Sequence, residues 1–125
     1  MFGGELPFSV TIANDANETS AIAVDLVVVY DDKIVDQLLK MPAAEWFKNK
    51  KQLRRDFGND VLVKEWEWIP SQSVDPQTIE YRPGARKVVL FADYATQGDH
   101  RAALDPQQPF HLTLDTLEMQ VQVAQ

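Results

Sequence analysis

Two glutamates, Glu65 and Glu67, are the residues best placed for acid–base chemistry, within the segment VLVKEWEWI. If this segment is a strand, residues two apart share a face and lie about 7 Å from each other. Carboxyl pairs near that separation act as acid and base in glycoside hydrolysis. A small carbohydrate-active or hydrolytic enzyme using Glu65 and Glu67 is therefore one interpretation. We favour an exposed polar strand face, because nothing else in the sequence indicates a sugar-binding cleft.

Other catalytic and metal-binding patterns are missing from the sequence. There is no cysteine, which excludes disulfides, thiolate zinc sites and cysteine nucleophiles. The two histidines, His100 and His111, are far apart, whereas a structural metal site needs three or four converging ligands. The five glycines form no nucleophile elbow, phosphate loop or dinucleotide fingerprint. We therefore expect a binding protein that is not an enzyme and that has no metal and no cofactor.

The basic residues are concentrated in one short segment. Five of the 12 lysines and arginines fall between Lys48 and Arg55, although the chain has a net charge of −7. The excess of acidic residues argues against general affinity for nucleic acid. A basic helix face on an acidic body attracts acidic surfaces, although such faces are often only solvated. We predict that a protein partner contacts this face, with the partner-binding residues Lys48, Lys51, Arg54 and Arg55.

The basic segment belongs to the one helical block in the sequence, which we place at about residues 32–57, after the second strand. Asp31 or Asp32 is expected to cap a short helix, and Pro42 to be the first residue of a second helix that ends at Gly58. The apolar positions that recur at helical spacing are Ile34, Val35, Leu38, Leu39, Trp46, Phe47, Leu53 and Phe57. We expect the block to cover a sheet edge with this side and to present its basic side to a partner.

The rest of the sequence has the periodicity of strands. Residues 6–12 alternate, residues 21–30 form an apolar run typical of a central strand, and in 61–69 we expect the tryptophan side to face inwards. Residues 109–114 and 117–123 indicate a terminal hairpin. About seven strands with frequent turn signals predict a single, mainly β domain over residues 1–125, a β-sandwich with a helical insertion. No apolar run reaches the roughly 20 residues that span a bilayer, so we expect a soluble domain.

Five short motifs between residues 24 and 104 resemble the TssJ family, the outer-membrane lipoproteins of the bacterial type VI secretion system. In that family a strand ending in tyrosine enters a helical excursion, and a Pro-Gly turn precedes a strand that is followed by a loop and a Trp- or His-Arg pair. The matching motifs are Val27-Val28-Val29-Tyr30, Ala44-Glu45-Trp46-Phe47, Arg82-Pro83-Gly84, Val89-Leu90-Phe91-Ala92-Asp93-Tyr94 and His100-Arg101-Ala102-Ala103.

This resemblance implies a transthyretin-like β-sandwich with an added helix. It also implies a structural role in the type VI secretion membrane complex, at the periplasmic face of the outer membrane. The implied partner is the periplasmic domain of TssM, with further contact to the TssL and TssM complex. The implied attachment to the membrane is a lipid on an N-terminal cysteine. The chain opens abruptly on Met1 and Phe2, and we expect a longer natural N-terminus to precede them. A secretion effector or cytoplasmic accessory protein remains an alternative.

Overall fold

A computed structural model describes residues 3–123, so Met1 and Phe2 at the start of the chain lie outside the described residues. Two four-stranded sheets contain all the described strands. Sheet A has the order β4-β1-β7-β8 and sheet B the order β3-β2-β5-β6. The elements are β1 (Gly4–Ile12), β2 (Ile22–Val29), α1 (Asp32–Leu38), α2 (Ala43–Phe57), β3 (Val61–Trp68), β4 (Gln77–Tyr81), β5 (Lys87–Ala92), β6 (Arg101–Leu104), β7 (Phe110–Leu114) and β8 (Met119–Val123), with 3-10 turns at Ala16–Thr19 and Gly58–Asp60.

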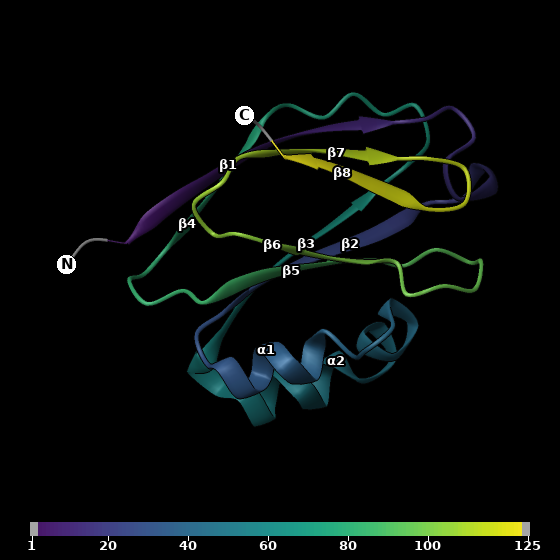
Figure 1. Cartoon of the computed structure of the whole chain (residues 1–125). Coiled ribbons are helices and arrows are strands. Elements are labelled where there is room, and N and C mark those ends of the chain that lie inside the picture. The colour runs from purple at the N-terminus through teal and green to yellow at the C-terminus, as the bar shows by residue number, and fades with distance from the viewer. Residues whose placement is uncertain (1–2, 124–125) are drawn as a thin grey trace.

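The elements form three layers: sheet A, sheet B and the helix pair (Figure 1). The prediction of a mainly β sandwich with helices after the second strand is confirmed. The described residues contain eight strands, where the sequence pattern gave about seven. The main core lies between the sheets and includes Leu6, Phe8, Leu26, Leu90 and Leu112.

Strand β2 is an inner strand of sheet B, and apart from Asp25 its side chains on both faces are apolar. Val24, Leu26 and Val28 pack into the core between the sheets, whereas Val27 and Val29 pack into a second core beneath the helices. A strand buried on both sides reads as a continuous apolar run, as the sequence pattern of 21–30 predicted. Its neighbours on either side are β3 and β5, both antiparallel to it.

The helix pair covers one face of sheet B, not a sheet edge as the sequence led us to expect. Ile34, Leu38 and Trp46 are buried against the outer faces of β2 and β5. Apolar side chains on that face of the sheet require a cover, and the amphipathic helices supply it. The helix block is therefore a third layer of the structure.

The helix ends follow ordinary capping chemistry. The Asp31 side chain accepts a hydrogen bond from the backbone N–H of Lys33 at 2.7 Å, which caps α1 as predicted. Pro42 has extended backbone angles and is the N-cap of α2. We expected it to be the first residue of the helix, but the helix begins at Ala43. Gly58 ends α2 with a φ of 55°, a backbone conformation that residues with a Cβ atom rarely adopt.

Sheet A differs from sheet B because its strands alternate. In β1, Leu6 and Phe8 are buried towards sheet B, while Glu5 and Pro7 are exposed on the other side. Strand β1 pairs antiparallel with β4 and parallel with β7, and the β7–β8 hairpin forms as predicted. Alternating strands bury one face and leave the other to water. No described helix or strand covers the outer face of sheet A.

Candidate functional site

Helix α2 is held against sheet B by a buried tryptophan. The Trp46 ring stacks on Phe91 with centroids 5.1 Å apart and planes 7° from parallel. Its indole Nε1–H donates to Asp25 Oδ2 at 2.9 Å. Trp46 is fully buried, so this hydrogen bond satisfies its one polar atom in the place where water is excluded. The contact fixes how far α2 lies from the sheet.

Beside Trp46, a lysine from α2 lies between two carboxylates of sheet B. Asp25 of β2 and Glu65 of β3 are directly opposite each other in the strand register, where like charges repel. Lys50 Nζ donates to Asp25 Oδ2 at 3.0 Å and to Glu65 Oε2 at 2.6 Å. Arg54 Nη1 donates to Glu65 Oε1 at 3.1 Å. We call Asp25, Trp46, Lys50, Arg54 and Glu65 the ionic clamp.

The protonation of the ionic clamp follows from its contacts. Burial lowers the pKa of Lys50, but its hydrogen bonds to Glu65 and Asp25 outweigh burial and hold the pKa above the ordinary 10.5. The hydrogen bond from Lys50 holds the pKa of Glu65 below its ordinary 4.5. Lys50 and Glu65 therefore stay charged at neutral pH. Asp25 is only 1% exposed, and its Oδ1 has no hydrogen-bond partner among the described residues.

The structure divides the predicted partner-binding residues into two groups. Lys48, Lys51 and Arg55 are exposed and form no ion pair with any residue from 3 to 123. They are spaced three and four residues apart, so they form one stripe on α2, which we call the basic stripe. Arg54 is also exposed, but it pairs with Glu65 as part of the ionic clamp.

Sequence reasoning missed the structural role of Lys50, which it counted only as part of the basic face. Its position was the available signal, because a residue four places after the buried Trp46 shares its side of the helix. The acidic partner of Lys50 at Asp25 could not be identified from spacing, since 25 residues separate them.

The two glutamates first considered for catalysis do not share one environment. Glu65 is on an exposed strand face as expected, but it also accepts hydrogen bonds from Lys50 and Arg54 of α2 in the ionic clamp. Glu67 is exposed. A carboxyl whose pKa is lowered by a lysine stays ionised near neutral pH and is a poor general acid. The prediction that the tryptophan side faces inwards is confirmed, because Trp66 and Trp68 pack in the main core.

The two histidines make separate local contacts. His111 Nδ1 is 2.6 Å from Ser9 Oγ and its Nε2 is 2.9 Å from Thr11 Oγ1. The His100 ring stacks on Tyr94 with centroids 4.9 Å apart. Within the described part of the chain, no three acidic or histidine side chains are grouped so that they could hold a metal ion.

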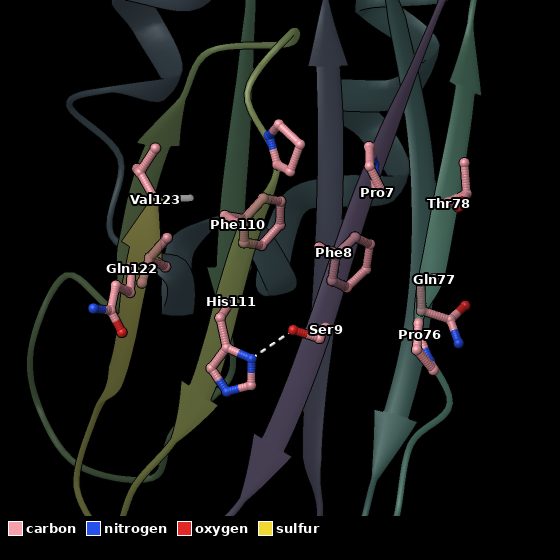
Figure 2. Close-up of a pocket in the computed structure, with 12 residues that line it drawn as sticks. Pro7, Phe8, Ser9, Pro76, Gln77, Thr78, Phe110, His111, Gln122 and Val123 are labelled. Carbon is pink, nitrogen blue, oxygen red and sulfur yellow. Dashed lines mark hydrogen bonds between the residues drawn. The ribbon is translucent and has the colours of Figure 1, made fainter. Parts of the chain in front are cut away.

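A groove of about 850 Å³ crosses the outer side of sheet A. Figure 2 shows it with His111 and Ser9 of neighbouring strands hydrogen bonded on its floor. Its lining includes the prolines at positions 7, 76 and 109. Thr78 of β4 and Gln122 of β8 line opposite sides. The basic stripe and this groove are thus on opposite layers of the protein.

The sequence and the structure were compared with those of known proteins. No known protein family profile matches the sequence, and no curated protein matches it. Among solved structures, the type VI secretion lipoprotein TssJ1 from Pseudomonas aeruginosa superposes with a TM-score of 0.71 and 15% identity, over 98% of both chains. Serratia marcescens Lip, a membrane-bound component of the type VI secretion system, also gives 0.71, with 12% identity and the same coverage. A type VI membrane complex gives 0.66 with 15% identity, again over 98% of both chains.

The chain therefore has the fold of the TssJ and Lip lipoproteins of type VI secretion, over nearly its whole length. This confirms, at the level of the fold, the resemblance carried by the five sequence motifs. In the described residues neither α1 nor α2 is long and apolar enough to cross a membrane.

Proposed function

We propose that this chain is a non-enzymatic structural component of a type VI secretion membrane complex. In this role it stands at the periplasmic face of the outer membrane, attached by a lipid on an N-terminal cysteine that precedes the present sequence. It holds the complex there by binding the periplasmic domain of TssM through protein surface alone. The observation that carries the proposal is the match over 98% of both chains to TssJ1, a lipoprotein of this system.

The basic stripe is the surface that we propose for this contact. Lys48, Lys51 and Arg55 are exposed, while the ionic clamp and Trp46 fix the helix that bears them. Cations on a rigid support lose little conformational freedom on binding, which favours affinity. Arg54 supports the stripe indirectly, because its ion pair with Glu65 holds the last turns of α2 to β3.

Binding to the purified periplasmic domain of TssM from the same genome tests the proposal. We expect isothermal titration to detect a complex with the unaltered chain. The combined change Lys48→Glu, Lys51→Glu and Arg55→Glu should weaken it by about tenfold or more, because each reversal turns attraction into repulsion. The fold should be unaffected, since these exposed side chains have no partner in residues 3–123.

A matched control separates a local contact from net charge. Lys33→Glu, Lys40→Glu and Arg86→Glu make the same charge change at exposed positions in α1, just after α1 and before β5, where Arg86 has one exposed ion pair, with Asp32 at 4.0 Å. We expect the control to retain binding within about threefold. Equal losses in both variants would reduce the basic stripe to a solvated helix face. No complex with the unaltered chain would reject TssM as the partner.

The proposed anchor has its own test. The gene region upstream of Met1 should encode a signal peptide followed by a cysteine, and the full-length protein should incorporate labelled palmitate in cells. Substitution of that cysteine should release the protein from the outer-membrane fraction. A gene without such a leader would favour the alternative of an accessory protein that acts elsewhere in secretion.

A further inference from the structure

The net negative charge of the protein is confined to sheet A and its flanking segments. Residues 1–21, 69–81 and 105–125 contain all four strands of this sheet, and they hold eight acidic residues and no lysine or arginine. The other 11 of the 19 acidic residues are balanced by all 12 lysines and arginines. The layer that carries the groove is thus the acidic pole of the molecule.

Two of these acidic residues are directly opposite each other on the outer face of sheet A. Glu5 of β1 pairs with Glu80 of β4 in the strand register. The next pair, Leu6 and Ile79, is buried in the core, so Glu5 and Glu80 point to the outer side, where both are exposed. Opposed side chains have Cβ atoms about 5 Å apart, and like charges at that separation destabilise a sheet.

No cation from the described chain relieves this repulsion. Neither Glu5 nor Glu80 has an ion pair with a residue from 3 to 123. On sheet B the same arrangement of Asp25 opposite Glu65 is neutralised by Lys50. The chain therefore places a cation between the carboxylates that it covers itself. Arg82, two residues beyond Glu80, stacks on Tyr30 and forms no ion pair with Glu5 or Glu80.

The groove begins next to the opposed glutamates. Pro7 and Thr78 line it and are two residues from Glu5 and Glu80 on the same strand faces, a step of about 7 Å. From there it crosses β1 and β7 to Val123 and Gln122 of β8. Its lining combines proline and valine surface with the hydrogen-bonding groups of Ser9, Thr78, His111 and Gln122.

We propose that this face docks an extended segment of a protein partner that carries lysine or arginine. One cation of the segment would lie between Glu5 and Glu80, as Lys50 lies between Asp25 and Glu65, and the following residues would cross the groove. Nucleic acid and anionic lipid headgroups do not suit this face, because the segments that form sheet A hold no lysine or arginine to neutralise a phosphate. The site is distinct from the basic stripe, which is on the opposite layer.

The test uses the whole chain, labelled with ¹⁵N, and a nine-residue peptide of alternating arginine and serine. We expect the peptide to shift amide signals of β1, β4 and β7, while a peptide of alternating glutamate and serine shifts none. The double change Glu5→Gln and Glu80→Gln should weaken binding about fivefold. The control, Asp36→Asn with Glu45→Gln, removes the same charge from exposed positions on α1 and α2 and should change binding less than twofold.

A second pair of variants tests the groove without altering the glutamates. Thr78→Lys places a cation in the groove and should weaken binding about tenfold, whereas the neutral Thr78→Gln should retain it. Shifts spread over both layers, or equal losses in test and control variants, would overturn the proposal. So would self-association of the free protein in sedimentation that Glu5→Gln with Glu80→Gln abolishes, because it would assign the face to a second copy of the chain.

Discussion

The two sheets of this protein each carry a pair of opposed carboxylates on the outer face, and among residues 3–123 a cation forms ion pairs with the carboxylates of sheet B but not with those of sheet A. Asp25 and Glu65 are joined by Lys50 from α2, whereas Glu5 and Glu80 face water. The same local arrangement is thus partly buried on one side, where Asp25 is covered by α2, and fully on the surface on the other. The difference shows that the helical insertion provides charge as well as apolar cover.

The apolar residues explain why only one sheet is covered. Strands β2 and β5 are mainly apolar on both faces, with Asp25 as the exception in β2, and an exposed apolar sheet face would promote association with other molecules. In β1 and β7 polar residues occupy alternate positions, which allows one face to remain in water. The following changes test this contrast, beginning with the largest expected effect.

Removing the central contact of the covered face should cost the most stability. Trp46→Ala deletes a fully buried ring stacked on Phe91 and leaves Asp25 without its indole donor. We expect the free energy of unfolding to fall by about 3–5 kcal/mol. Urea denaturation followed by circular dichroism measures it. A loss below about 1 kcal/mol would mean that α2 contributes little to the stability of sheet B.

Removing the cation of the ionic clamp should have the next largest effect. Lys50→Met leaves the buried Asp25 carboxylate without its positive charge. A broken buried pair costs about 3–5 kcal/mol, but Lys50 is part-exposed and Trp46 still donates, so we expect about 2 kcal/mol. Lys51→Met, the next residue along and exposed, is the control and should stay within about 0.5 kcal/mol. Equal losses of stability in the two variants would mean that the ion pairs of Lys50 contribute no more to the fold than an exposed lysine does.

Acid should weaken the covered face through Glu65. Because its pKa is held below 4.5 by Lys50, ionised Glu65 stabilises the fold above pH 4.5, and this contribution is lost as the pH falls through the lowered pKa. At pH 7 we expect Glu65→Gln to be less stable than the parent by roughly 1 kcal/mol or less, since the pair is partly screened by water. The difference should narrow in denaturation curves recorded at pH 4 and 3. A constant difference would contradict the assignment.

The smallest effect is expected on the bare face. His111→Ala removes hydrogen bonds to Ser9 and Thr11 on the outer side of sheet A and leaves the core untouched. The loss of stability should be about 1 kcal/mol or less. A larger loss, approaching that of Trp46→Ala, would show that the bare face contributes to the fold as much as the covered one.

Much of this fold could be predicted from local patterns. Alternation identified β1 and the β7–β8 hairpin, the apolar run identified the central β2, and Asp31 and Gly58 marked helix ends. These signals depend on near neighbours in the chain and survive in a single sequence. The number of strands and the exact start of α2 at Pro42 were predicted less accurately, because the ends of helices and strands depend on contacts with distant parts of the chain.

The candidate site was predicted only in part. The concentration of cations in 48–55 indicated a basic helix face, but the sequence did not show which of them were free. The sequence also did not show that Arg54, one of the residues predicted to bind a partner, pairs with Glu65 within the chain. Glu65 is on an exposed strand face as expected, but its ion pairs with Lys50 and Arg54 of α2 were not predicted. The groove of sheet A was not predicted, since its lining comes from four strands far apart in the chain.

The sequence by itself determined the β-rich class, the helical insertion and the segregation of charge, because composition and periodicity carry that information. Only the tertiary structure decided that the insertion covers a sheet face, that Lys50 lies between Asp25 and Glu65, and that Glu5 opposes Glu80 across an open face. The physical reason is the same in each case. Strand register and layer order bring together residues that are distant in sequence, and the sign and burial of their charges then determine which side chains are structural and which are free to bind.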